Sequence, residues 1–185
     1  MTGGGPIRLT ALPDRGAAVA ALERIFFESS SRTEFASEQD RLSFFERWTS
    51  YYLDHRPEYV WLWMESDGGF SGYLTGCLDS AAAGPLYESL ASYTVFEDRF
   101  AEFPAHLHVN CRSARRNVGI GAGLVDTFIN DCVAAGVAGV HVVTAPGARN
   151  VRFYNRVGFT ERVTRAYLGR PLLFMGRRLG AESKA

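Results

Sequence analysis

The stretch that decides the fold is AHLHVNCRSARRNVGIGAG, residues 105–123. Its first seven residues, 105–111, alternate apolar and polar side chains, which predicts a half-buried strand. Arginines and glycines follow, and from Ile120 onward apolar residues recur at helical spacing, which predicts an amphipathic helix. A helix that starts directly after a strand presents free backbone N–H groups and the positive end of its dipole. The sequence therefore predicts an anion site at this turn, suited to a pyrophosphate.

Two common phosphate-binding motifs do not fit this turn. A P-loop needs a glycine followed by lysine, and no glycine in the chain precedes a lysine. A dinucleotide fingerprint has the spacing Gly-x-Gly-x-x-Gly, whereas Gly119, Gly121 and Gly123 are evenly spaced. What the turn does contain is RNVGIG, residues 116–121, which has the form Arg/Gln-x-x-Gly-x-Gly/Ala. This hexapeptide resembles the acetyl-CoA loop of the GNAT superfamily of N-acetyltransferases.

The second half of the chain extends the resemblance. A strand is predicted at 138–144, and residues 150–159, NVRFYNRVGF, then place Asn, Phe-Tyr and Gly-Phe in the order typical of the same superfamily. The resemblance covers roughly residues 59–179. The segment FPAHLH, residues 103–108, is also similar to the C-terminal acetyltransferase-like domain of eukaryotic O-GlcNAcase, and we interpret the chain as a bacterial-type stand-alone relative of that domain.

The resemblance implies an α/β (α+β) fold of the three-layer GNAT type. We expect a mixed sheet of about seven strands flanked by helices, with a long insertion before the fourth strand. One acetyltransferase domain would occupy residues 1–185, with the insertion at 79–104 and the acetyl-CoA-binding core at 105–159. The strands at 105–111 and 138–144 are expected to run parallel and to splay at the cofactor.

The remaining segments carry ordinary signals for helices and strands. Asp14 and Ser37 are good N-cap residues, and the apolar spacing behind them predicts helices over 15–29 and from 37 to about 53. The turn SDGG at 66–69 predicts a hairpin. The expected strands outside the core are 7–12, 59–65, 70–78, 159–166 and 172–179.

The connection at 79–104 is unusually long for a link between two strands, and such segments are functional or disordered. Its five aromatic residues argue against disorder. Burial of their apolar surface favours packing on the sheet by about 25 cal/mol per Å², so we expect a lid over the acceptor side. The alternative is a packed excursion away from the cleft. In a lid, the acidic residues would face a confined space that suits a cationic amine, namely Glu88, Glu97, Asp98 and Glu102.

Cofactor-binding roles follow from the resemblance, residue by residue. The loop backbone would bind the pyrophosphate, the arginines beside it would meet phosphates, and the end of the strand before it would pair with the pantetheine arm. Asn150 matches the family asparagine that bonds the pantetheine or the preceding strand, and it equally fits a helix cap. The candidate cofactor-binding residues are Val109, Asn110, Cys111, Arg115, Arg116, Asn117, Val118, Gly119, Ile120, Gly121, Ala122, Asn150 and Phe153.

Acetyl transfer from a thioester to an amine also needs a proton acceptor for the amine and a proton donor for the thiolate. Tyr154 matches the family tyrosine whose hydroxyl protonates the leaving thiolate, and the alternative is a core tyrosine. The candidate general bases are His108 and then Glu102. His106 and His108 do not by themselves indicate a metal site, because the sequence shows no third ligand.

Composition narrows the possible partners. The formal net charge is zero, so no global basic field would attract nucleic acid or an anionic membrane. Cys77, Cys111 and Cys132 are an odd, widely spaced set, typical of reduced thiols in a cytoplasmic protein. We expect a monomer or homodimer.

The resemblance thus implies an acetyl-CoA-dependent N-acetyltransferase that transfers an acetyl group directly to a small-molecule or peptide amine in a ternary complex. The alternative is a non-catalytic relative that acts as a binding module. A nucleotide-binding enzyme is excluded by the glycine spacing.

Overall fold

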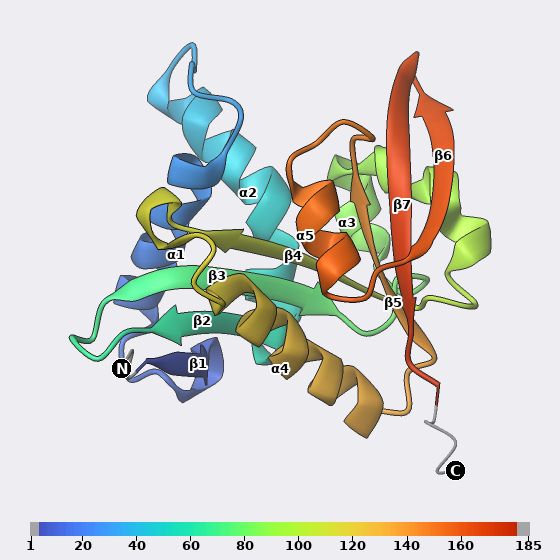
Figure 1. The fold of residues 1–185 in the computed structure, drawn as a ribbon. Helices are drawn as coiled ribbons and strands as arrows, with labels where there is room; N and C mark the ends of the chain where they lie inside the picture. The colour runs from blue at the N-terminus through green and yellow to red at the C-terminus, as the bar shows by residue number, and fades with distance from the viewer. Residues whose placement is uncertain (1–3, 181–185) are drawn as a thin grey trace. The chain divides into compact units, whose positions relative to one another are not determined.

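The computed structural model describes residues 4–180 as a mixed seven-stranded sheet with helices beside it (Figure 1). The strands are β1 (Gly5–Arg8), β2 (Val60–Met64), β3 (Phe70–Cys77), β4 (Ala105–Cys111), β5 (Gly139–Thr144), β6 (Glu161–Tyr167) and β7 (Arg170–Arg178). The α-helices are α1 (Arg15–Ser29), α2 (Glu38–His55), α3 (Gly84–Ser89), α4 (Ile120–Ala134) and α5 (Asn150–Arg156). Short 3-10 helices are η1 (Leu9–Ala11), η2 (Pro57–Tyr59), η3 (Ala91–Arg99) and η4 (Ser113–Arg115). The order of the strands is β1-β2-β3-β4-β5-β7-β6, and the predicted fold class is confirmed.

The chain forms two compact units. Each unit consists of two segments of the chain. The first unit comprises the segment that ends at Gly76 and the segment His108–Phe128, and the second comprises Cys77–Leu107 and the segment that begins at Ile129. Both β4 and α4 run from one unit into the other. None of the helices within residues 4–180 has the length and apolar character that crossing a membrane requires.

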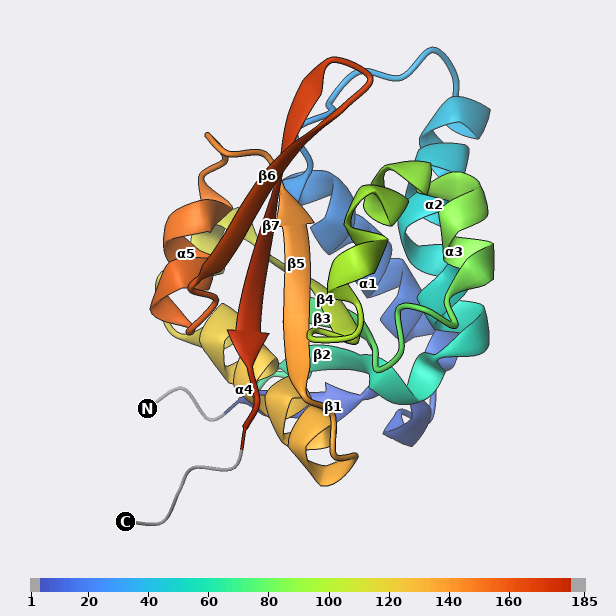
Figure 2. The same cartoon turned by 90° about the vertical axis from the view of Figure 1, so that its right-hand side faces the viewer.

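In the first unit, β1, β2 and β3 form antiparallel pairs. The beginning of α4 lies on one side of these strands, while α1 and α2 lie on the other (Figures 1 and 2). The approach of α4 depends on glycine in β3, because a Cβ atom added at Gly76 would lie 2.3 Å from the Phe128 ring. Side chains of Asp14 and Ser37 accept backbone N–H groups of Ala17 and Asp40, so both predicted helix starts are confirmed.

One predicted strand is shorter than expected. We predicted a strand over 7–12, but β1 ends at Arg8 and η1 follows, closed by a hydrogen bond from Leu12 N–H to Leu9 O of 3.2 Å. This turn places the Leu9 side chain in the core, where only 1% of it is exposed. The apolar residues that resembled a continuing strand therefore belong to a turn.

In the second unit, β5 pairs antiparallel with β7, and β7 pairs antiparallel with β6. The predicted parallel pairing of β4 and β5 is confirmed, and it comprises Ala105 with Val140 and His106 with His141. The splay of these strands at the cofactor stays a prediction. Helix α5 was not predicted, because it has only seven residues and its N-cap residue, Arg149, makes no side-chain capping bond.

The insertion at 79–104 contains α3 and η3, and its aromatic residues are packed as predicted. Phe96 and Phe103 are fully buried, with ring centroids 5.5 Å from that of Phe174 in β7. Phe100 stacks on His141 in β5 at 5.2 Å. The packing of the insertion on β5 and β7 is thus observed, while a covering of the acceptor side stays a prediction.

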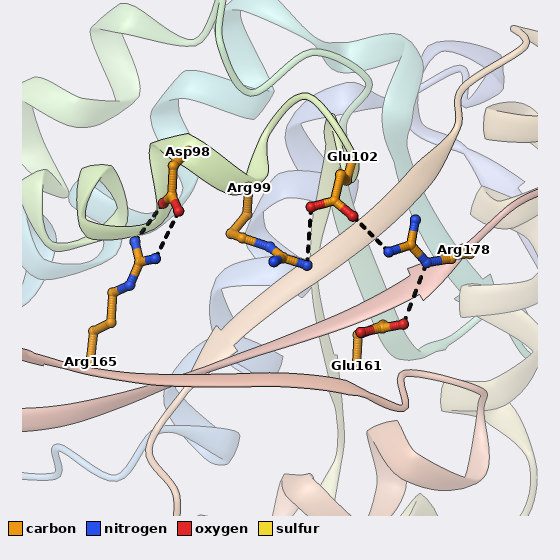
Figure 3. A network of polar contacts seen from close by, with 6 residues as sticks. All are labelled: Asp98, Arg99, Glu102, Glu161, Arg165 and Arg178. Atoms are coloured by element: carbon orange, nitrogen blue, oxygen red, sulfur yellow. Dashed lines mark hydrogen bonds and ion pairs between the residues drawn. The ribbon is translucent and has the colours of Figure 1, made fainter.

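Ion pairs attach the insertion to the β6–β7 hairpin (Figure 3). Arg165 in β6 donates to both carboxylate oxygens of Asp98, at 2.5 and 2.7 Å. Arg178 in β7 lies 2.6 Å from Glu102 and 3.4 Å from Glu161. Our expectation that Asp98 and Glu102 serve a cationic amine is therefore corrected, because arginines already neutralise both carboxylates.

The close approach of Phe103 to β7 gives the first testable prediction. A Cβ atom at Gly176 would lie 2.6 to 2.9 Å from atoms of the Phe103 ring, which is itself fully buried and has little room to move. Gly176→Ala should lower the free energy of unfolding by about 1–3 kcal/mol, as overpacked cores do. Gly147→Ala is the control, because a Cβ atom there meets nothing within 4 Å. Equal stabilities of the two variants in urea denaturation would contradict the packing.

Candidate functional site

The turn between β4 and α4 has the backbone that an anion site needs. Asn117 and Gly119 are both left-handed, with φ of 62° and 94°. The first helical bond runs from Gly123 N–H to Gly119 O at 2.9 Å. The N–H groups of the three residues before Gly123 therefore have no partner one turn earlier in the helix, as at any helix start. Left-handed residues and free N–H groups together form the concave donor sets that bind phosphate.

This donor set is open on its outer side. A Cβ atom added at Gly119 would meet nothing within 4 Å, and the Val118 side chain is 56% exposed. Within residues 4–180, no atom outside Gly119 and its chain neighbours therefore lies close to that side of the turn. The start of α4 is therefore accessible from the side of Gly119 and Val118.

Two carboxylates hold the basic part of this turn. Glu28, at the end of α1, accepts hydrogen bonds from Ser113 N–H at 2.7 Å and Ser113 Oγ at 2.6 Å. Glu65, after β2, accepts from Arg115 Nε at 2.9 Å. Sequence reasoning missed both glutamates. They lie 85 and 50 residues before their partners, and no local pattern connects them.

The end of β4 contains three of the candidate residues. The Asn110 side chain bridges two elements, because its Nδ2 donates to Tyr73 Oη at 2.8 Å and its Oδ1 accepts from Ser29 Oγ at 3.0 Å. Val109 and Cys111 are partly buried. Burial raises the pKa of Cys111 to about 11, so this thiol is protonated at neutral pH.

His108 lies between aromatic side chains of α2. Its ring centroid is 5.7 Å from those of both Trp48 and Tyr52, with edge-to-face geometry. Desolvation lowers the pKa of His108 to about 4, so the imidazole is neutral at neutral pH. A neutral imidazole has the lone pair that a general base needs.

Glu102 lies in a different environment. It pairs with Arg178 at 2.6 Å and with Arg99 at 3.3 Å (Figure 3). The hydrogen bond from Arg178 lowers the pKa of Glu102 below its usual value. A carboxylate stabilised in its charged form is a weak proton acceptor, and so is an imidazole with a pKa of about 4, so the pKa shifts do not favour one candidate base over the other.

Helix α5 carries the remaining candidates. Asn150 is its first residue, and its Oδ1 accepts a hydrogen bond from Thr144 Oγ1 in β5 at 2.9 Å. Asn150 thus bonds the preceding strand, one of the two roles that the resemblance implied, and it does not cap the helix. Tyr154 is 5% exposed and contacts Phe153 and Phe159 edge to face.

A second tyrosine interacts electrostatically with Tyr154. Tyr93 in η3 is 7% exposed, and its pKa is raised, first by burial and then by the phenols of Tyr154 and Tyr87. Tyr93 is therefore a neutral phenol at any physiological pH. Sequence analysis placed it among the aromatic residues of the insertion and gave it no further role.

The structure thus gathers the candidates into two groups. In the first unit, the left-handed turn follows the end of β4, and His108 lies three residues before Cys111 on the same strand. In the second unit, Tyr154 and Asn150 share α5, whereas Glu102 belongs to the ion-pair network of the insertion. The described part of the chain holds no group of three His, Cys, Asp or Glu residues that could bind a metal ion.

Solved structures share this fold across nearly their whole length. SsHAT is 22% identical with a TM-score of 0.70, over 94% of this chain and 98% of that chain. Salmonella typhimurium yncA, with its cofactor acetyl-CoA, is 18% identical with a TM-score of 0.57, over 97% and 96%. Chaetomium thermophilum Naa20, in complex with a bisubstrate analogue, is 17% identical with a TM-score of 0.58, over 95% and 86%. No curated protein matches the sequence.

The mixed seven-stranded sheet, in which β4 leads through a glycine turn into α4, is the fold of a class of acetyltransferases. Residues 19–159 match the acetyltransferase (GNAT) family, and the chain belongs to that family. The protein is an acetyltransferase, and its cosubstrate is acetyl-CoA.

The burial of His108 predicts how stability depends on pH. Between its ordinary pKa of 6.5 and about 4, the unfolded chain binds a proton at this residue that the folded chain does not bind. The contribution of His108 to the free energy of unfolding therefore falls as the pH falls through that window, and it is constant below the window. His108→Gln should reduce the loss of stability between about pH 7 and about pH 5, measured by urea denaturation.

The control for this prediction is His55→Gln, which changes an exposed histidine at the end of α2. This variant should keep the pH dependence of the unchanged protein. If His108→Gln had the same pH dependence of stability as the unchanged protein, His108 would have the same pKa in the folded and the unfolded chain.

Proposed function

We propose that this protein is an N-acetyltransferase that moves the acetyl group of acetyl-CoA directly to an amine while both substrates are bound. The observation that carries the proposal is the left-handed turn at Asn117 and Gly119, which leads into the free N–H groups of α4. The bisubstrate analogue bound to Naa20 and the acetyl-CoA bound to yncA support direct transfer on this fold.

The loop 116–122 would hold the diphosphate. Backbone N–H groups supply most of the contacts, so the backbone conformation matters more than the side chains. Arg116 adds a charge, since its guanidinium makes no hydrogen bond or ion pair with the described residues. The backbone of Val109, Asn110 and Cys111 would pair with the pantetheine arm, which brings the activated acetyl thioester to the chain.

Two side chains would move protons. The amine must lose a proton before it attacks the carbonyl carbon, and the neutral imidazole of His108 would accept it. The thiolate that leaves must gain a proton, and the hydroxyl of Tyr154 would donate it. Asn150 and Phe153 would contact the cofactor from α5.

The acceptor would be a small-molecule or peptide amine. We further propose a cytoplasmic monomer or homodimer that does not bind nucleic acid or membranes, in keeping with zero net charge and three free cysteines. The relationship to the O-GlcNAcase domain stays a prediction from the segment 103–108.

Gly121→Asp tests the loop. The substitution would place a negative charge and a side chain at the helix start where the diphosphate would bind, so we expect loss of micromolar binding of acetyl-CoA in calorimetry. Gly136→Asp, in the turn that follows α4, is the control for a new aspartate at a glycine. Because Gly136 has φ of 70°, both variants should first be shown to be folded by circular dichroism. Micromolar binding retained in Gly121→Asp would remove the loop from the cofactor site.

Tyr154→Phe tests the proton donor. The change removes one hydroxyl from a buried ring and keeps the packing against Phe159. The rate of thiol release with an accepted amine should fall roughly 10²-fold or more, with little change in the affinity for acetyl-CoA. Tyr167→Phe on β6 is the control. An unchanged rate in Tyr154→Phe would mean that the thiolate leaves without this hydroxyl.

A further inference from the structure

The basic turn after β4 is tied to the first unit by two acidic side chains from distant parts of the chain. Glu28, on α1, accepts hydrogen bonds from both the backbone N–H and the hydroxyl of Ser113 through its Oε1. Its Oε2 lies 3.2 Å from Arg112 Nε. Glu65, after β2, lies 2.8 Å from Arg115 Nη2 and 2.9 Å from Arg115 Nε. Arg112 and Ser113 are therefore bonded to α1, and Arg115 is bonded to the connection after β2.

These contacts also change the charge that the turn presents. The positive charge of Arg112 is compensated by Glu28, and that of Arg115 is compensated by Glu65. Arg116 makes no ion pair with any residue from 4 to 180. Of the three arginines, one is left to add its charge to the backbone N–H groups.

We propose that Glu28 and Glu65 are positioning residues that preset the phosphate loop in the conformation that receives the cofactor diphosphate. This inference rests on the proposed role of the loop 116–122. It assigns a binding function to two negatively charged residues beside an anion site, where simple electrostatics would disfavour them.

The physical reason is preorganisation. Asn117 and Gly119 are left-handed, a conformation that a free chain adopts rarely at a non-glycine residue. A loop that is not held must be ordered when the ligand binds, which reduces affinity. The Ser113 hydroxyl and its short hydrogen bonds hold the pKa of Glu28 below its usual value, so the carboxylate is charged at neutral pH. Hydrogen bonds to a charged acceptor are stronger than those between neutral groups.

The two explanations of Glu28 predict effects of opposite sign. If Glu28 acts only through its charge, Glu28→Ala should make acetyl-CoA bind more tightly, because the repulsion of the phosphates is removed. If Glu28 positions the loop, the same change should weaken binding. We expect the dissociation constant for acetyl-CoA to rise about five- to tenfold in Glu28→Ala and in Glu65→Ala, measured by calorimetry.

The kinetic readout separates positioning of the phosphate loop from general damage. Both variants should raise KM for acetyl-CoA and leave kcat nearly unchanged, since the reacting groups lie elsewhere. S-acetyl-pantetheine, which lacks the diphosphate, should be used equally well by the variants and by the unchanged protein. A loss of activity with both donors would show a merely structural role and would overturn the proposal.

Matched controls come from the same elements. Glu23→Ala removes a carboxylate from α1 that pairs with Arg41 of α2 and not with the loop. Asp67→Asn removes a charge from the β2–β3 turn and keeps the acceptor of the bond from Gly69 N–H. Both should bind acetyl-CoA as the unchanged protein does, and a weakening in these controls equal to that in the test variants would contradict the positioning role.

The outcomes also separate this inference from the proposed function. If Gly121→Asp abolishes binding while Glu28→Ala and Glu65→Ala bind acetyl-CoA as well as before or better, the loop is the cofactor site and the positioning role alone is wrong. If Gly121→Asp binds acetyl-CoA normally, the loop is not the site, and the proposed function and this inference fall together.

Discussion

The constraint on which the candidate site depends is a helix start that must stay open. The first N–H groups of α4 have no helical partners, and a Cβ atom at Gly119 would meet no atom of residues 4–180 within 4 Å. Such groups are costly when buried and useful when an anion can reach them. In the first unit, β4 leads into the turn, and the glycines of β3 let α4 pack closely on that strand.

The net charge around the turn between β4 and α4 cannot be inferred from the composition or from the local sequence, because it depends on carboxylates from other parts of the chain. The chain is neutral overall, and its three loop arginines look like a basic cluster. In the folded protein, carboxylates from α1 and from the β2–β3 connection compensate two of them. The remaining positive character comes from Arg116 and from the backbone dipoles at the start of α4.

The second unit uses its acidic and aromatic residues in a different way. Asp98 and Glu102 connect the insertion to β6 and β7, and Phe103 fills a space that Gly176 leaves open. These contacts make the insertion an integral part of the unit. They also favour the charged form of Glu102, because two arginines lie beside its carboxylate.

The sequence by itself determined the elements whose signals are local. The alternation in 105–111, the cap at Asp14 and the glycine spacing after Arg116 depend on neighbouring residues, and β4, α1 and the start of α4 appeared at the predicted positions. Only the tertiary structure decided which partners the charged and aromatic side chains take. Glu28 meets Ser113 across 85 residues, and His108 loses its hydration to rings on α2. Hydrogen bonding, ion pairing and desolvation act through space, so their effects on a side chain cannot be read from its neighbours along the chain.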